Sequence, residues 1–253
     1  MRTYFGGLIT FAICVSLVWL INWTLILPHS NIAFCLTLLI LVFSLMLLGL
    51  VINARLDGIL IDNRNRVSLS KFQATIWTVL VIAALICVAS HNLALSGDTT
   101  ALDFDIPTAL LAAMGISATS LVAAPAVLSM KAQSDPTPEN ATRAIASATA
   151  AGAIPQFAGK VFGRANPASA SWADIVRGEE VGAETTPDLS KIQQLYITLL
   201  LIGIYGVAVL HGLSSTPGKI PGLPELNEKF VWLMGVSHAS YLAYKATPHT
   251  ANG

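Results

Sequence analysis

Long apolar stretches without a charged residue are the feature that most constrains how this chain folds. A helix that crosses a bilayer needs about 20 consecutive, mostly apolar residues. Such stretches lie at about 6–28, 32–53, 74–95, 106–130 and 194–213. Only 11% of the residues are charged, against about 25% in soluble domains, and they gather between the stretches. The sequence therefore predicts an all-α, multi-pass membrane protein.

A sixth stretch, 229–245, is shorter and contains His238, two serines and two tyrosines. Hydropathy alone does not distinguish whether this stretch is a membrane span or an interfacial helix. The first stretch exceeds the 7–15 apolar residues of a signal peptide and lacks a small-residue cleavage site, which favours a retained span. With six spans and a cytoplasmic N-terminus, twelve of the fourteen Lys and Arg residues, Arg64 and Arg66 among them, become cytoplasmic. This distribution follows the positive-inside rule and predicts that both termini are cytoplasmic.

The pentapeptide LSKFQ at 69–73 returns as LSKIQ at 189–193. An ungapped comparison of 69–120 with 189–240 gives 13 identities in 52 positions. This predicts a duplicated two-helix unit. Because each unit crosses twice, both copies start on the same side and are parallel repeats. The duplication also predicts that the sixth stretch crosses the membrane, as its counterpart 106–130 does.

These patterns divide the chain into five parts. They are a transmembrane hairpin (1–57), repeat 1 (58–130), a cytoplasmic Ala/Gly/Pro-rich linker (131–187), repeat 2 (188–247) and a tail (248–253). In the linker, Thr137-Pro138 predicts a helix start, and a second, short helix is expected at 172–176. Large apolar residues are few there, so we expect no separate core. The segment is either a plain linker or a partner-binding appendage.

Each repeat begins with a serine followed three residues later by glutamine, the pattern of a capping box. The four residues are Ser70, Gln73, Ser190 and Gln193. Since lipid offers a helix end no hydrogen-bond partners, such caps suit a helix entering the bilayer. Lys71 and Lys191 would then contact lipid headgroups. Alternatively, the two copies form a pair of equivalent sites for a polar ligand.

Small residues recur every four positions in the fourth and sixth stretches. The predicted packing seam consists of Gly115, Thr119, Ala123, Gly235, Ala239 and Ala243. Small side chains let helix backbones approach closely. The serines beside them are Ser117, Ser120, Ser237 and Ser240. These either hydrogen-bond within and between helices or line a polar conduit.

Three histidines are candidate functional residues. His91 and His211 occupy equivalent positions at the outer ends of the third and fifth stretches. They either cap the last carbonyls of a helix or bind a metal and respond to pH. His238 lies within the sixth stretch, where an ionisable residue is a functional hypothesis by default. A hydrogen-bonded structural histidine is the alternative.

Motifs of known catalytic sites are missing. The chain has no Walker loop, GxSxG or HExxH sequence. Asp174, Glu179, Glu180 and Glu184 have no evident catalytic partner, and Cys14, Cys35 and Cys87 lie in apolar runs. We therefore expect no catalytic residues, no cofactor and no metal. A net charge of zero gives no reason to expect nucleic-acid binding.

Two stretches, SLSKFQATIWTVL and LPELNEKFVWLMGVSHASYLAYKA, carry a resemblance. They resemble a group of uncharacterised bacterial multi-pass membrane proteins that pair an S-x-x-Q helix start with a final (L/M)GxSxxxYL helix and a lysine. The resemblance covers about 58–130 and 185–247. It implies a bacterial membrane protein of this fold and no catalytic residues.

Three functions remain after these exclusions. The first is a non-enzymatic scaffold in the bacterial inner membrane, with the lipid bilayer and a second copy or another membrane protein as partners. The second is a passive channel or facilitator for a small solute or ion, lined by the fourth and sixth helices with His238 as a gate. The third is a lipid-processing enzyme that uses the acidic residues of 131–187.

Overall fold

Six long helices make up most of the computed structural model, which describes residues 2–247. The predicted tail, 248–253, lies outside the described residues. The long helices are α1 (Arg2–Leu25), α2 (Ser30–Asn53), α3 (Leu69–Ser96), α4 (Thr108–Lys131), α6 (Leu189–Ser215) and α7 (Glu228–Ala246). Each coincides with one of the six stretches that the sequence singled out.

Short elements connect the long helices. Four 3-10 helices are η1 (Gly58–Leu60), η2 (Thr99–Leu102), η3 (Pro167–Ser169) and η4 (Trp172–Val176). Between α4 and α6 lie α5 (Pro138–Ala150) and an antiparallel hairpin of β1 (Pro155–Ala158) and β2 (Val161–Arg164). The mostly helical prediction is confirmed, with one small hairpin added.

Four of the long helices are long and apolar enough to cross a membrane: α2, α3, α4 and α6. In α1 the apolar part is a shorter stretch, Ala12–Leu25. Helix α7 has 19 residues and carries the polar side chains noted in its sequence. By length and composition, the chain is a membrane protein.

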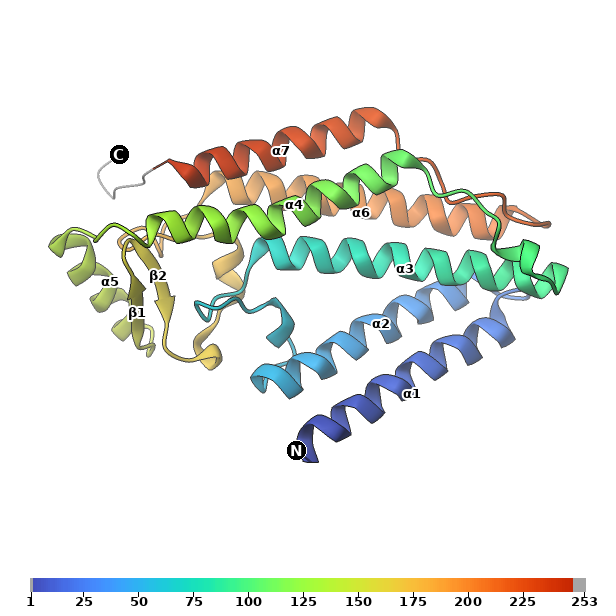
Figure 1. Ribbon diagram of the computed structural model, residues 1–253, viewed down its shortest axis with the longest axis horizontal. Coiled ribbons are helices and arrows are strands. Elements are labelled where there is room, and N and C mark those ends of the chain that lie inside the picture. The colour runs from blue at the N-terminus through green and yellow to red at the C-terminus, as the bar shows by residue number, and fades with distance from the viewer. Residues whose placement is uncertain (1, 248–253) are drawn as a thin grey trace.

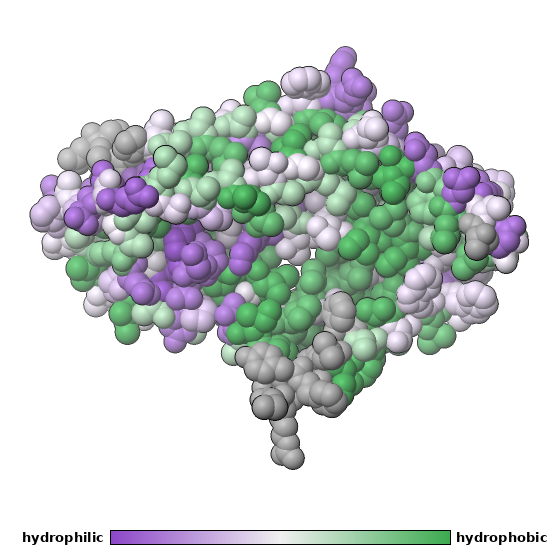
Figure 2. All heavy atoms as spheres, in the orientation of Figure 1, coloured by the Kyte–Doolittle hydropathy of each residue, from purple (hydrophilic) through white to green (hydrophobic). Residues whose placement is uncertain are grey.

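The helices run in alternating directions between two ends of the molecule (Figure 1). Helices α3, α4, α6 and α7 lie side by side, and the α1–α2 hairpin packs along α3. At one end α5 and the β-hairpin cover the bundle, and at the other the α3–α4 and α6–α7 connections meet. There Asp105 pairs with Gly222 in a parallel bridge. Hydrophobic residues gather over the helices and hydrophilic residues toward the two ends (Figure 2).

The segment 132–187, which we call the cap, is folded rather than a plain linker. Helix α5 begins as predicted, with Thr137 as its N-cap and proline in its first turn. It packs Ala144 and Ala148 against Phe162 and Val181 in a small core. The expected short helix at 172–176 is present as η4. The prediction that this segment lacks a core is wrong, because alanines on one face of α5 suffice to cover the hairpin.

Both predicted capping boxes are wrong by two residues. The N-cap of α3 is Ser68, whose hydroxyl accepts from Lys71 N, and the N-cap of α6 is Asp188, whose carboxylate accepts from the backbone of Ser190 and Lys191. Ser70 and Gln73 are instead buried inside α3, and Gln193 is exposed. The turn before α3 positions this N-cap, because Ser68 N donates to Leu60 O across that turn.

Candidate functional site

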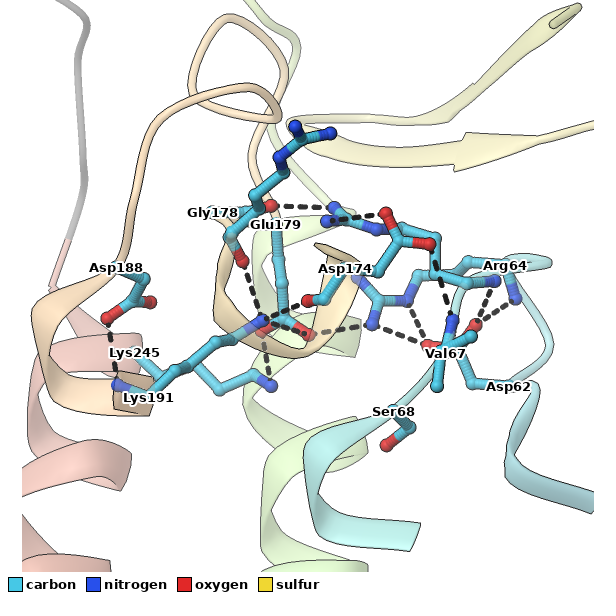
Figure 3. Close-up of polar contacts among 12 residues, drawn as sticks. Asp62, Arg64, Val67, Ser68, Asp174, Gly178, Glu179, Asp188, Lys191 and Lys245 are labelled. Atoms are coloured by element: carbon cyan, nitrogen blue, oxygen red, sulfur yellow. Dashed lines mark hydrogen bonds and ion pairs between the residues drawn. The ribbon is translucent and has the colours of Figure 1, made fainter. Parts of the chain in front are cut away.

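Charged side chains converge where the cap meets the ends of α3, α6 and α7 (Figure 3). The charged cluster consists of Asp62, Arg64, Arg66, Arg164, Asp174, Glu179, Lys191 and Lys245. Every one of these side chains is at most 13% exposed. Charges buried to this degree are stable only when paired and hydrogen-bonded, so their partners define the site.

A tight turn before α3 supplies two of the arginines. Asp62 Oδ1 accepts from the backbone N–H groups of Arg64 and Arg66, and Asn65 adopts a left-handed conformation with φ 57°. Asparagine tolerates that region better than most residues. The turn directs both arginines toward the cap, where the Arg66 Nη1 donates to Gly178 O at 2.7 Å.

The carboxylate of Glu179 lies among three cations from three different elements. Arg64 Nη2 is 2.8 Å and Lys191 Nζ 3.4 Å from Oε1, and Lys245 Nζ contacts Oε2. Burial alone would raise the pKa of Glu179, but the charges of Lys191, Lys245 and Arg64 outweigh it. The pKa is therefore well below the ordinary value of 4.5, and the group stays ionised at neutral pH.

Asp174 forms a second centre in the cluster. Arg164 donates to both of its oxygens at 2.6 and 2.8 Å, and Arg66 Nη2 lies at 3.5 Å. The same carboxylate accepts from Ser171 N and closes a capping box at η4. Burial raises its pKa, but the Arg164 hydrogen bonds and the Arg66 charge bring the net pKa below the ordinary value.

The charged cluster contains five cations and three carboxylates, so carbonyl oxygens complete it. Lys191 Nζ donates to Arg177 O at 2.8 Å, in addition to its contact with Glu179. Lys245 Nζ donates to the hydroxyl of Tyr241 at 2.8 Å and lies over that ring. Tyr241 is buried one turn further into the bundle, so it connects the charged cluster with the interior of α7.

Neutral polar side chains continue inward from this point between α3, α4, α6 and α7. This polar core consists of Gln73, Trp77, Ser117, Ser120, Gln194, Thr198, Tyr205, Ser237 and His238, all buried. Gln73 Nε2 donates to Thr198 Oγ1 at 2.7 Å, and Gln194 Nε2 donates to Gln73 Oε1 at 3.0 Å. Ser120 Oγ and His238 Nδ1 are 2.5 Å apart. These contacts join α3 to α6 and α4 to α7.

Several polar atoms of the polar core have no hydrogen-bond partner among the described residues. They are Trp77 Nε1, Ser117 Oγ, Gln194 Oε1, Tyr205 OH, Ser237 Oγ and His238 Nε2. A buried polar group without a partner costs ~1–3 kcal/mol, and water or a polar ligand is the usual remedy in proteins. These six atoms can therefore form further hydrogen bonds in the interior of the bundle.

Most of the predicted packing seam lies outside the contact between α4 and α7, although a Cβ at Gly235 would lie 3.6 Å from Ile116 Cδ1 of α4. Gly115, Thr119, Ala239 and Ala243 are exposed. A side chain added at Gly115 would meet no atom within 4 Å. The two helices meet through neighbouring faces that carry buried residues of the polar core, such as Ser120 of α4 and His238 of α7. The seam residues Ala123 and Gly235 are only partly buried.

The predicted polar and histidine positions separate into two groups. Ser117, Ser120, Ser237 and His238 are brought together, whereas Ser240 is exposed on α7. His91 is buried with Nε2 3.1 Å from Gly218 O, and His211 is exposed. Among the described residues no group of three or more His, Cys, Asp or Glu forms a candidate metal site.

Neither predicted headgroup lysine presents a free ammonium group. Lys71 Nζ donates to Ile61 O at 2.7 Å. Lys191 is 2% exposed and belongs to the charged cluster, so its assignment to lipid headgroups is wrong. Burial by the folded cap, which the sequence did not predict, accounts for this difference.

Four acidic residues in the second half of the cap have structural partners. Asp174 and Glu179 belong to the charged cluster, Glu180 pairs with Lys131 at 2.6 Å, and Glu184 accepts from Ser147 and Gly182. Carboxylates engaged in this way are not available as a catalytic pair. The use of these residues by a lipid-processing enzyme therefore has no support in their geometry.

Sequence reasoning missed several residues of the site. The sequence analysis singles out none of six residues that belong to the charged cluster or the polar core: Asp62, Arg164, Lys245, Trp77, Gln194 and Tyr205. One signal was present: Gln73 and Gln194 are amides within or beside apolar stretches, where an unpaired polar group is costly. No family model matches the chain, and no match was found among curated proteins or solved structures.

Replacing Glu179 with glutamine tests the charged cluster. The variant keeps the shape but leaves Arg64, Lys191 and Lys245 without their common anion. Breaking a buried pair costs ~3–5 kcal/mol, so we expect a clearly lower thermal unfolding midpoint in mild detergent. Glu139→Gln, at an exposed pair with Arg143 on α5, should change it little. Equal midpoints for the two variants would contradict the central role of Glu179.

The same cluster predicts acid sensitivity. The folded-state pKa values of Glu179 and Asp174 lie below their ordinary values of 4.5 and 3.8. Their contribution to stability is therefore complete above those values and is lost as the pH falls through the lower folded-state values. Unfolding midpoints measured from pH 7 down to pH ~3 should drop below pH ~4.5. The drop should be shallower in Glu179→Gln, which retains only the contribution of Asp174, and an equally steep drop would show that Glu179 does not contribute.

Proposed function

We propose that this chain is a passive facilitator for a small, neutral, polar solute. The solute path runs between α3, α4, α6 and α7. The observation that supports it best is the set of six buried polar atoms without partners in the polar core. A solute or water passing there would find hydrogen-bond donors and acceptors that the protein itself leaves open.

The chemistry of the lining favours a neutral solute. Amide, hydroxyl, indole, phenol and imidazole groups line the polar core. The stretches 74–95, 106–130 and 194–213 contain no Asp, Glu, Lys or Arg, and the charged residues of 229–245 are the lysines at its two ends. A transported ion would need compensating charge or many aligned dipoles at this depth. Neutral donors and acceptors suit a molecule such as glycerol or urea.

In this proposal the charged cluster closes the path on the side of the cap. Glu179 holds Lys191 on α6 and Lys245 on α7 together, and Tyr241 lies directly beneath. Opening requires these ends to separate, and the cost of unpairing buried charges keeps the closed state populated. His238, partway along α7, is the inner gate of the path.

Two further parts of the proposal concern placement. The positive-inside distribution favours six spans with both termini and the cap in the cytoplasm, and the resemblance to bacterial multi-pass proteins favours the inner membrane. The alternation of helix direction supports six spans with both termini on one side (Figure 1). The common direction of the α3–α4 and α6–α7 hairpins supports their origin by duplication.

Two serines of α7 provide a matched test. Ser237 is buried in the polar core and Ser240 is exposed. In liposomes under an osmotic step of glycerol or urea, wild type should accelerate swelling over empty vesicles. Ser237→Leu removes a polar contact worth ~1.4 kcal/mol or more, so permeation should fall at least ~tenfold, whereas Ser240→Leu should retain it. Equal rates for wild-type and empty vesicles would refute the proposal.

The second candidate is an assembly module, and the exposed small residues of α4 and α7 favour it. Gly115, Thr119, Ala239 and Ala243 are open to the surroundings, where small side chains permit close helix contact with another copy. In this proposal the cap makes further contacts with a partner protein.

A substitution at Gly115 tests assembly without disturbing the fold, since an added side chain meets no atom of the chain within 4 Å. If copies associate there, Gly115→Leu should convert an oligomer to monomer in mild detergent, as measured by light scattering after size exclusion. Val207→Leu, exposed on α6 and away from this face, should leave the oligomer intact. A wild-type protein that is monomeric at all concentrations would remove the basis for this candidate.

A further inference from the structure

An apolar groove opens between α2 and α3 near the cap. Its volume is about 720 Å³, within the ~300–1,000 Å³ range of sites for small molecules. Leu45 and Met46 line it from α2, Thr75 and Val79 from α3, and Ile202 from α6. Helices α2 and α3 diverge toward this end (Figure 1), and both are long and apolar enough to cross a membrane. The groove therefore opens toward hydrocarbon rather than water.

One charged residue and one tryptophan also line the groove. Asp57 and Trp172 belong to its lining, and Trp172 packs edge-on against Phe72 with ring centroids 6.1 Å apart. Tryptophan is typical of the level where hydrocarbon meets headgroups. Asp57 forms a bidentate pair with Arg55, with both N–O distances 2.8 Å. The groove thus changes from apolar to charged at the point where α2 ends.

Arg55 has hydrogen-bonding capacity to spare. A guanidinium carries five N–H donors, and three recorded bonds use Nε and Nη2 on Asp57 and Nη1 on Ala168 O. Its side chain is 26% exposed. The remaining N–H groups, on Nη1 and Nη2, suit a phosphate, for which arginine is the preferred partner.

We propose that this groove is a phospholipid site, in which one acyl chain lies between α2 and α3 and the headgroup phosphate binds Arg55 beside Asp57. The apolar lining recognises the chain and the rim recognises the headgroup. Asp57, adjacent to the phosphate, suits a headgroup that also carries an ammonium group, as in phosphatidylethanolamine. This inference is independent of whether a solute passes through the polar core.

Native mass spectrometry of the purified full chain tests the site. The probes are a phosphatidylethanolamine and a diacylglycerol with the same acyl chains. Wild type should retain one phosphatidylethanolamine per chain and prefer it over the diacylglycerol. Leu45→Trp and Thr75→Trp fill the groove from opposite sides. Because two buried methylenes account for about a tenfold change in affinity, retention should fall at least ~tenfold in each.

Two controls separate the parts of the proposal. Phe43→Trp, exposed on α2 and outside the groove, should retain lipid as wild type does, which also shows that an added tryptophan in α2 is tolerated. Arg55→Gln should remove the preference for phosphatidylethanolamine while the diacylglycerol still binds. Undiminished lipid retention in both groove-filling variants would overturn the proposal. It would also be overturned if these variants lost a bound second copy of the chain instead of a bound lipid.

Discussion

Glu179 and the three cations around its carboxylate join the cap to the bundle, beside an apolar contact in which Ile175 packs with Leu60 and Ile61. Arg64 comes from the turn before α3, Lys191 from the first turn of α6 and Lys245 from the last turn of α7. Each charge is buried, so none is stable without the others. The cap thereby depends on the bundle, and the cap-side helix ends depend on the cap. Segment 132–187 is for this reason a structural component and not a tether.

The bundle has apolar side chains on both its inner and its outer faces, and the polar core lies among buried residues such as Leu80, Leu201 and Met234. Large apolar side chains such as Val122, Val207 and Trp232 face outward, where lipid surrounds them. Hydroxyl, amide and imidazole groups face inward between α3, α4, α6 and α7. Burial of polar groups in hydrocarbon is costly unless they are hydrogen-bonded, so the presence of the polar core needs an explanation. Hydrogen bonds within the polar core, as between Gln73 and Thr198, satisfy only some of its polar atoms.

How much of this was predictable depends on the range of the interactions. The long helices follow from local composition, since any stretch of about 20 apolar residues needs a helix in a bilayer. The start of α6 did not follow: the Ser190–Gln193 pattern fits a cap, but the carboxylate of Asp188 occupies that role. The charged cluster could not be predicted from local sequence, because Arg64 and Glu179 are 115 residues apart. His238 was found because an ionisable residue stands out in an apolar stretch, although its partner Ser120 lies in another helix.

The cross-links of the polar core bear on the relation between the two hairpins. Gln73 joins α3 to α6, and His238 joins α7 to α4, so first helix meets first helix and second meets second. This is the pairing that the proposed parallel repeats, related by an axis along the membrane normal, would produce. The side chains do not keep the symmetry: Gln73 is buried while its counterpart Gln193 is exposed, and the position equivalent to His238 is Ala118. Duplication would then supply the helix arrangement, and the later divergence of a few interior positions would supply the polar core and its single histidine.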